Sequence, residues 1–304
     1  MIIVSGENLI DVFQTKNKIN YKMLVGGAGF NTALALGRLK SSIYYLSNIS
    51  KDYFGNNIFK QLKKNNIKTN LVDRSDFLTA LALVSNQKKP QFSFYSTNSA
   101  FRYTYKKQVS KKYLKKINLA YFTCLSLYLE PVASQSLKLM KDLKGKSIIF
   151  VDPNIRKKII LNKNNFINLF KKYMRFANII KLSDEDLKYL SNNRNEKKTI
   201  LKWIKFYDLS GVILTKGKNG ATLYTKNFCV NEKARKTKIV DTVGAGDTFS
   251  AGIISYFERK KLLNLKKINN ISIKDWSTAL RFANKIASIN CSRAGCNPPK
   301  INLV

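Results

Sequence analysis

The stretch Asp241–Phe249, which reads DTVGAGDTF, joins a β-branched run over 237–240 to an apolar, helix-like pattern over 249–257. Its small residues allow backbone N–H groups of 243–247 to converge at the start of that helix, an arrangement that favours an anion, above all a phosphoryl group. Asp247 places a carboxylate beside this anion site, which suits a base that takes a proton from an incoming hydroxyl. A lone Gly-x-Gly would indicate only a strand-to-helix turn with an Asp in the first helical turn. Nine consecutive residues fitting a phosphoryl-transfer loop favour the chemical interpretation.

The composition is that of a globular protein. The chain has 304 residues, 44% of them hydrophobic, so it can bury a large core as one domain or two. The first twelve residues carry an early acid and no basic segment, and no apolar run approaches the roughly 20 residues needed to span a bilayer. The four cysteines are too scattered for a disulfide framework or a metal cluster. We therefore expect a cytoplasmic protein with reduced thiols and no membrane association.

The formal net charge of +37 raises the question of a nucleic-acid partner. Only ten of the 55 basic residues are Arg, the residue preferred for bidentate phosphate recognition, and the lysines form scattered doublets instead of one tract. This pattern predicts weak, salt-dependent attraction to polyanions but no specific nucleic-acid function.

The chain contains no histidine, which excludes Ser-His-Asp and Cys-His catalysis and histidine-based zinc sites. Acid–base chemistry must then fall to carboxylates, Lys, Tyr or Cys. Because there are only 18 carboxylates, an Asp at a strand end or beside a glycine is a stronger candidate than usual.

Strand-like and helix-like patterns alternate along the chain, which indicates βα units and a parallel sheet with helices on both faces. Brief apolar runs predict buried strands. These runs lie at 2–5, 42–49, 119–124, 147–151, 179–182 and 211–215. Helical patterns cover 31–39, 55–65 and 273–291 among others.

Two segments, 12–25 and 78–105, lack the helical period and contain alternation, as in the pentapeptide FSFYS at 92–96. They predict antiparallel hairpins, the second turning near 87–90. A small β-sheet inserted in an α/β body commonly forms a lid that excludes water from a ligand. Its exposed edges also invite pairing between subunits.

Further polar residues follow predicted strands, where ligands of open α/β sheets gather. Each also has a purely structural interpretation as a turn or a helix cap. These candidates are Asp11, the GGAGFN cluster over 26–31, Glu130, the segment Asp152–Arg156, and the turn Thr215–Ala221. A P-loop is excluded, because Met140 stands where the first Gly of that motif would precede Gly145-Lys146-Ser147.

The residues of 241–254, DTVGAGDTFSAGII, resemble the C-terminal signature of the PfkB/ribokinase family of carbohydrate kinases at every position, and 26–37, GGAGFNTALALG, resembles the N-terminal one. Similar segments occur at 6–11, 152–156, 181–186 and 291–299, and together these look most like bacterial fructokinases. The resemblance implies a ribokinase-like fold: a doubly wound, mostly parallel sheet flanked by helices, with a small β-sheet lid formed by roughly 12–25 and 78–105 in a single domain over 1–304.

The resemblance also implies roles for individual residues. Asp247 matches the general base, and Gly244, Ala245 and Gly246 match the anion hole for the transferring phosphoryl group. Sugar-contacting positions correspond to Asp11, Gly27, Asn31 and Arg156. Nucleotide-lining positions correspond to Thr215, Gly217 and Asn284. Asp241 lies where family members often bind a monovalent cation, near Ser292 and Gly295.

One position departs from the family pattern. The family's Asn-x-x-Glu motif, linked to Mg²⁺ and phosphate, is replaced here by Ser183-Asp184-Glu185-Asp186. The resemblance gives Asp186 the place of the Glu, on a shorter arm. The implied cofactors are ATP and Mg²⁺, with K⁺ as the monovalent cation.

The resulting expectation is ATP-dependent phosphorylation of a sugar's primary hydroxyl, D-fructose to fructose 6-phosphate, by a homodimer that associates through the lid. Kinases for 2-keto-3-deoxygluconate, ribose or a nucleoside are alternatives within the family. An alternative of another class is a catalytically idle protein that binds polyanions or regulates.

Overall fold

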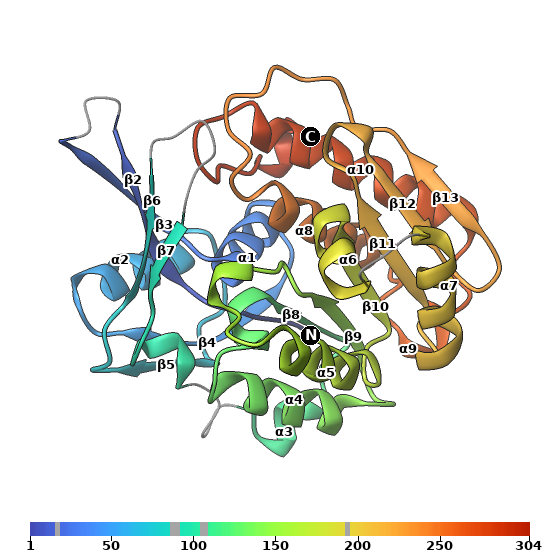
Figure 1. Cartoon of the computed structure of the whole chain (residues 1–304), viewed down its shortest axis with the longest axis horizontal. Helices are drawn as coiled ribbons and strands as arrows, with labels where there is room; N and C mark the ends of the chain where they lie inside the picture. Colours follow the sequence, from blue (N-terminus) through green and yellow to red (C-terminus); the bar gives the residue numbers. More distant parts are fainter. Residues whose placement is uncertain (16–18, 86–91, 104–108, 192–194) are drawn as a thin grey trace.

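The computed structural model describes residues 1–15, 19–85, 92–103, 109–191 and 195–304. Its centre is a nine-stranded sheet in the order β13-β12-β11-β10-β9-β8-β1-β4-β5 (Figure 1). The seven strands from β11 to β5 run parallel to one another, whereas β12 pairs antiparallel with both β11 and β13. The strands are β1 (Ile2–Ser5), β4 (Ile43–Ser50), β5 (Val72–Ser75), β8 (Leu119–Thr123), β9 (Ile148–Asp152), β10 (Ile179–Ser183), β11 (Gly211–Thr215), β12 (Ala221–Tyr224) and β13 (Cys229–Glu232).

The central strands are apolar on both faces because helices cover both faces. Along β9, Ile148 and Phe150 belong to one hydrophobic core, and Ile149 and Val151 belong to the other. Strand side chains alternate between faces, so this pattern places one core on each side of the sheet. The predicted doubly wound, mostly parallel sheet is confirmed.

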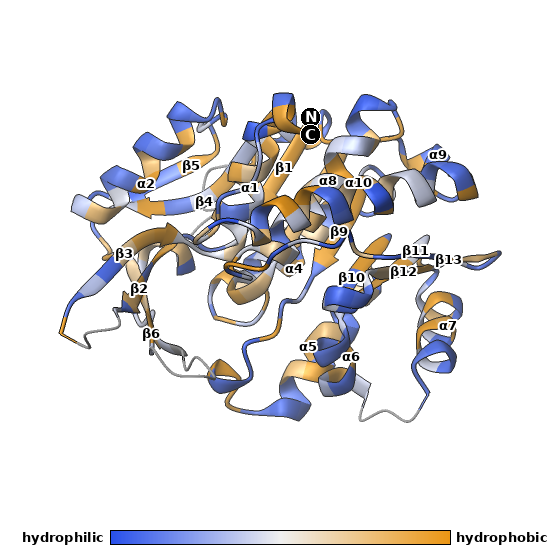
Figure 2. Cartoon of the chain, turned by 90° about the horizontal axis from the view of Figure 1, so that it is seen from above, coloured by the Kyte–Doolittle hydropathy of each residue, from blue (hydrophilic) through white to orange (hydrophobic). Residues whose placement is uncertain are grey.

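Helices form a layer on each face, as the view from above shows (Figure 2). The first core is covered by α1 (Ala28–Arg38), α2 (Tyr53–Lys64), α8 (Ala245–Arg259), α9 (Leu265–Ile268) and α10 (Ile273–Cys291). The second is covered by α3 (Lys111–Leu114), α4 (Val132–Leu143), α5 (Lys163–Met174), α6 (Asp184–Ser191) and α7 (Glu196–Tyr207). No helix among the described residues is long and apolar enough to cross a membrane.

The helix α10 shows how local sequence sets these elements. Ser272 caps its N-terminus by accepting from the N–H of Asp275, and the predicted bounds of 273–291 are those observed. The buried residues Trp276, Ala279 and Leu280 recur at helical spacing and turn one stripe toward the core.

A separate four-stranded sheet lies at one side of the molecule (Figure 1). It contains β2 (Leu9–Gln14), β3 (Tyr21–Gly26), β6 (Ala80–Val84) and β7 (Phe92–Tyr95), in the order β3-β2-β6-β7. Strands β2 and β3 are antiparallel, as are β6 and β7, whereas β2 and β6 run parallel and join the two pairs into one sheet.

Parts of the sequence-based expectation need revision. The alternating pattern from Phe101 gives a 3₁₀ helix over Ala100–Arg102 and no strand, because Phe101 turns into the core at 2% exposure. The β-branched run over 237–240 forms no strand either, and Ile239 and Val240 are exposed. The turn predicted near 87–90, and residues 104–105 of the second segment, lie outside the described residues.

Candidate active site

The principal cavity opens at the carboxyl ends of the parallel strands and has a volume of about 500 Å³. Strand β1 pairs with β4 on one side and with β8 on the other, so the order of the strands along the sheet reverses at β1. Open α/β sheets place their ligands at such a reversal. The walls of the cavity combine residues from the small sheet, α1, the segment after β9 and the loop before α8. The predicted residues that line it are Asp11, Gly27, Asn31, Arg156, Gly244, Ala245, Gly246 and Asp247.

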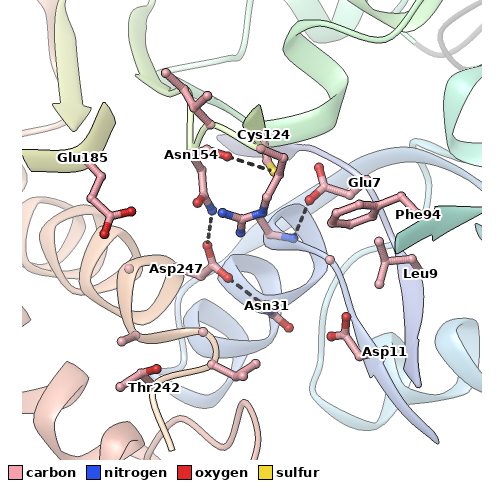
Figure 3. Close-up of a pocket in the computed structure, with 18 of the residues that line it drawn as sticks. Glu7, Leu9, Asp11, Asn31, Phe94, Cys124, Asn154, Glu185, Thr242 and Asp247 are labelled. Carbon is pink, nitrogen blue, oxygen red and sulfur yellow. Dashed lines mark hydrogen bonds between the residues drawn. The ribbon is translucent and has the colours of Figure 1, made fainter. Parts of the chain in front are cut away.

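Asp247 lies in the first turn of α8 and is buried. Asn31 Nδ2 donates to Asp247 Oδ2 at 2.9 Å, and Asn154 Nδ2 donates to Oδ1 at 3.3 Å. Figure 3 shows the carboxylate between these two amides, facing the cavity. Each carboxylate oxygen is therefore oriented by a different segment of the chain.

Burial raises the pKa of Asp247 from 3.8 to about 6, with further contributions from its neighbours. The hydrogen bond from Asn31 and the positive charges of Lys181 and Arg156 lower the pKa, while Asp152 raises it. The pKa of Asp247 therefore lies above the ordinary value for an Asp side chain. The carboxylate is still mostly ionised at pH 7, and a pKa near 6 makes it a stronger proton acceptor.

The loop before α8 is fixed by contacts with the C-terminal part of the chain. Gly244 has φ 72°, a left-handed conformation that favours glycine. A Cβ placed on Gly244 would lie 2.3 Å from Cys296 Sγ, so the thiol packs directly against the loop. Asn290 Nδ2 donates to Val243 O at 2.8 Å. These contacts hold the backbone of the predicted anion hole at the start of the helix.

A second cavity, of about 450 Å³, lies on the other side of this loop. Thr215, Gly217 and Asn284, the three predicted nucleotide residues, all line it. Asn284 also donates to the carbonyl oxygens of Glu232 and Lys233, which fixes the chain after β13. The two cavities share Thr242, Ala245 and Gly246 in their linings.

Asp11 lies within β2, and the strand continues beyond it to Gln14, so the expectation that it ends its strand is wrong. A Cβ on Gly26 would lie 1.9 Å from Asp11 Oδ2, so this glycine provides the space for the carboxylate. Burial raises the pKa of Asp11 from 3.8 to about 7; Arg156 opposes the shift, and the charges of Asp247 and Glu7 add to it.

Some residues of the segment Asp152–Arg156 line the principal cavity, whereas Asp152 is buried behind its wall. Asn154 adopts a left-handed conformation, with φ 39°, and turns its side chain to Asp247. Arg156 lines the cavity, and its backbone N–H donates to Tyr128 Oη at 3.2 Å. Asp152 is fully buried behind the wall, where Lys181 Nζ lies 2.8 Å from its Oδ2.

The predicted metal residues occupy different settings. Asp186 Oδ1 accepts from the N–H of Ile155, and its Oδ2 accepts from the N–H and Oγ of Ser183. Its neighbour Glu185, and not Asp186, lines the principal cavity and faces it in Figure 3. Asp241 accepts from the N–H groups of Val243 and Gly295.

Glu130, a weaker candidate from its position after a strand, is exposed and is not among the cavity residues. Its carboxylate accepts from the N–H and Oγ of Ser134 in the first turn of α4. The structure therefore supports the capping interpretation for this residue.

Glu7 is a cavity residue that received no role from the sequence. Its Oε1 accepts from the N–H of Ala28 at 2.7 Å, and its Oε2 from the N–H of Leu125 at 3.1 Å, which ties the start of α1 to the end of β8. Burial raises the pKa of Glu7, and the hydrogen bond from Ala28 opposes the shift. The available signal was its position directly after β1, in a chain with only 18 carboxylates.

The model of the pfkB family of carbohydrate kinases matches residues 2–302. A fructokinase from Rhizobium leguminosarum bv. trifolii is 29% identical over 281 residues, which cover 89% of this chain and 84% of the relative.

Two solved structures share the fold. A fructokinase from Xylella fastidiosa with bound ATP superimposes with a TM-score of 0.89 at 22% identity, covering 97% of this chain and 93% of that one. The aminoimidazole riboside kinase from Salmonella enterica, complexed with aminoimidazole riboside and an ATP analogue, gives 0.82 at 21% identity, with coverages of 97% and 94%.

Proposed function

This chain belongs to the pfkB family of carbohydrate kinases, and we propose that it transfers the γ-phosphoryl group of ATP to the primary hydroxyl of D-fructose, giving fructose 6-phosphate. The observation that carries the proposal is the pair of cavities that share Thr242, Ala245 and Gly246. A sugar in one and a nucleotide in the other would meet at a helix N-terminus, which stabilises negative charge.

Asp247 is the proposed general base. It faces the sugar cavity, its two oxygens are oriented by Asn31 and Asn154, and its pKa of about 6 leaves it ionised at neutral pH. It would take the proton of the primary hydroxyl as the hydroxyl oxygen bonds to phosphorus and the bond to the ADP oxygen breaks. Gly244, Ala245 and Gly246 form the proposed anion hole for the phosphoryl oxygens.

The proposed sugar contacts are Asp11, Gly27, Asn31 and Arg156, which all line the principal cavity. A carboxylate, an amide, a guanidinium and a bare backbone together offer donors and acceptors to a ligand rich in hydroxyls. The proposed nucleotide contacts are Thr215, Gly217 and Asn284 in the second cavity.

Mg²⁺ would accompany ATP and neutralise charge on the phosphates. Magnesium is usually held by one or two carboxylates together with substrate phosphates. Asp186 is the position implied by the family pattern, yet both its oxygens already accept hydrogen bonds, whereas Glu185 lines the cavity. Glu185 is therefore better placed than Asp186 to coordinate Mg²⁺.

K⁺ is the proposed monovalent cation, at Asp241. The carboxylate of Asp241 joins the loop before α8 to Gly295, so a cation there would support the anion hole. Turnover should rise when K⁺ replaces Li⁺ at constant ionic strength, and Asp241→Asn should abolish the response. Equal rates in both salts would remove K⁺ from the proposal.

The small sheet is the proposed lid and dimer surface. Tyr21 and Met23 on β3, and Tyr95 on β7, are each about half exposed or more, at 48%, 51% and 64%. Exposed apolar side chains on edge strands are suited to pairing between subunits. Light scattering should give a dimer for this chain, and a monomer for Met23→Lys/Tyr95→Lys.

The substrate test measures ATP consumption with D-fructose, 2-keto-3-deoxygluconate, ribose and a nucleoside. Fructose should give the highest kcat/KM, with fructose 6-phosphate identified by mass spectrometry. A higher value with another substrate would reassign the sugar and leave the kinase proposal intact. No turnover with any of them, alongside tight salt-sensitive nucleic-acid binding, would instead favour the catalytically idle alternative.

A further inference from the structure

A buried ion pair lies behind the anion loop, and the proposed mechanism does not yet use it. Lys181 Nζ lies 2.8 Å from Asp152 Oδ2, and the two side chains are 5% and 0% exposed. Asp152 is the last residue of β9, and Lys181 lies two residues before the end of β10, so both lie near the carboxyl ends of neighbouring strands.

The pair is connected to α8 on two sides. Ser250 Oγ, three residues after Asp247 on the same helix, donates to Asp152 Oδ2 at 3.1 Å. A Cβ placed on Gly246 would lie 3.0 Å from Lys181 Nζ, so the ammonium group lies against the backbone of the loop. Tyr121 Oη donates to the same Asp152 oxygen at 3.0 Å.

Stability alone does not account for this arrangement. Buried ion pairs are often no more stabilising than apolar residues of similar volume, because desolvation offsets the attraction between the charges. The other carboxylate oxygen, Asp152 Oδ1, is buried and has no hydrogen-bond partner within the described part of the chain. An incompletely satisfied buried ion pair that lies directly behind an anion loop is a candidate for function.

We propose that Lys181 is a positioning residue for phosphoryl transfer: held by Asp152 under the loop, it keeps Asp247 ionised and adds positive charge beneath the anion hole. The inference rests on the proposed role of Asp247 as base. Lys181 and Asp152 have opposite effects on Asp247, since the ammonium favours its ionised form and the carboxylate disfavours it. Removing either charge therefore leaves the effect of the other on Asp247 unopposed.

Other groups also act on Asp247, and Asn31 and Arg156 favour its ionised form as Lys181 does. Asn31 from α1 and Asn154 after β9 bond its two oxygens. The remaining titratable groups whose charge interacts with Asp247 are Asp11, Tyr121, Cys124, Arg156 and Cys296. Among them Arg156 is the only other cation, and it lies on the sugar side, as a residue of the principal cavity.

The test compares the pH dependence of kcat/KM in Lys181→Met, Asp152→Asn and the double variant. Lys181→Met should move the acidic limb up by about one pH unit, and Asp152→Asn should move it down by about one unit. The double variant should return near the original midpoint. At pH 8, where Asp247 is ionised in all of them, the two variants lacking Lys181 should be roughly tenfold slower, less than the loss of a direct oxyanion donor.

A purely structural pair predicts a different result: each variant would lower kcat by the same factor at every pH, with no shift of the limb. That result, or shifts of the same sign in both single variants, would overturn the inference. Should Lys181→Met fail to fold in a thermal melt, the near-isosteric Asp152→Asn decides alone, and a midpoint that stays or rises contradicts the proposal.

Two controls complete the design. Lys226 pairs with Asp208 on the surface, and Lys226→Met should leave the profile unchanged. Asp247→Asn tests the proposed function separately: if it retains turnover, the base assignment fails. If it is inactive while Asp152→Asn shows no shift, only the role of Lys181 fails.

Discussion

Asn31 and Asp247 lie 216 positions apart in the sequence, and Asn31 Nδ2 donates to Asp247 Oδ2 at 2.9 Å. This bond joins the first helix of the chain to the helix that carries the proposed base. The proposed sugar-facing wall and the proposed phosphoryl-transfer loop are therefore joined by a hydrogen bond, although the sequence presents them as two separate glycine-rich segments.

Asp247→Asn should lower kcat by roughly 10²–10⁴, because a general base typically contributes this factor. Nucleotide affinity, measured by calorimetry with ADP, should change little, since Asp247 does not line the second cavity. Asp142→Asn, an exposed substitution on α4, is the matched control and should keep full turnover. Near-normal turnover in Asp247→Asn would contradict the assignment.

The pH profile of kcat/KM should fall on the acid side with a midpoint near 6, where Asp247 takes up a proton. The hydrogen bond from Asn31 favours the ionised carboxylate, so Asn31→Ala should raise the midpoint by about one unit. The variant should therefore lose more activity at pH 6 than at pH 8, and equal losses at both values would argue against this coupling.

Asp11→Asn should stabilise the protein at neutral and higher pH while raising KM for the sugar. Burial raises the pKa of Asp11 from 3.8 to about 7, so ionisation favours unfolding. The contribution of protonated Asp11 to the free energy of unfolding is complete below the pKa of the unfolded state and is lost as the pH rises through about 7. Removing the charge should recover at most roughly 4 kcal/mol of the free energy of unfolding.

Thermal melts at pH 8 and pH 4.5 measure this effect. The gain from Asp11→Asn should be large at pH 8 and small at pH 4.5. Asp76→Asn, at a side chain that is 87% exposed, is the control and should show no such pH-dependent gain. A gain that does not grow with pH would contradict the electrostatic explanation.

Gly244→Ala should disable the loop, because a Cβ there would meet Cys296 Sγ at 2.3 Å and the backbone φ is 72°. We expect kcat to fall at least about 10²-fold, the typical loss of one oxyanion donor. Gly145 has φ 73° with nothing within 4 Å of its Cβ position, so Gly145→Ala isolates the backbone strain.

Gly145→Ala should cost about 1–2 kcal/mol of stability and leave kcat unchanged. If the contact with the thiol is the cause at Gly244, then Cys296→Ala should partly restore the activity of Gly244→Ala. A double variant that is no better than the single one would point to the strain alone.

Local patterns predicted most of the fold. The apolar runs at 2–5 and 211–215 are strands with those bounds, because strands covered on both faces need continuous apolar sequence. The parallel pairing of β2 with β6 could not be predicted, since these strands are far apart in sequence and no local pattern encodes their register. The alternating pattern was misleading at 101–102, which form a 3₁₀ helix with Ala100, because burial of Phe101 overrides strand propensity.

The site shows the same division. The glycines and the carboxylate of the loop over 241–249 are consecutive in the chain, so the sequence alone predicted an anion site with an adjacent base. The shift in the pKa of Asp247 and the place of Lys181 under Gly246 depend on tertiary packing of segments that the sequence keeps apart. For Asp186, the resemblance to the family motif implied a metal role. In the structure its carboxylate instead accepts three hydrogen bonds, from the N–H of Ile155 and from the N–H and Oγ of Ser183.

The two cavities draw largely on different segments of the chain and share Thr242, Ala245 and Gly246 of the loop before α8. Residues of 7–11, 27–31 and 154–158 supply much of the first cavity, whereas residues of 215–220 and 234–239 supply walls of the second. If the proposed assignment of sugar and nucleotide to these cavities holds, the acceptor should be exchangeable without redesign of the donor side. A library confined to the first set should yield kinases for new acceptors that still use the same phosphoryl donor.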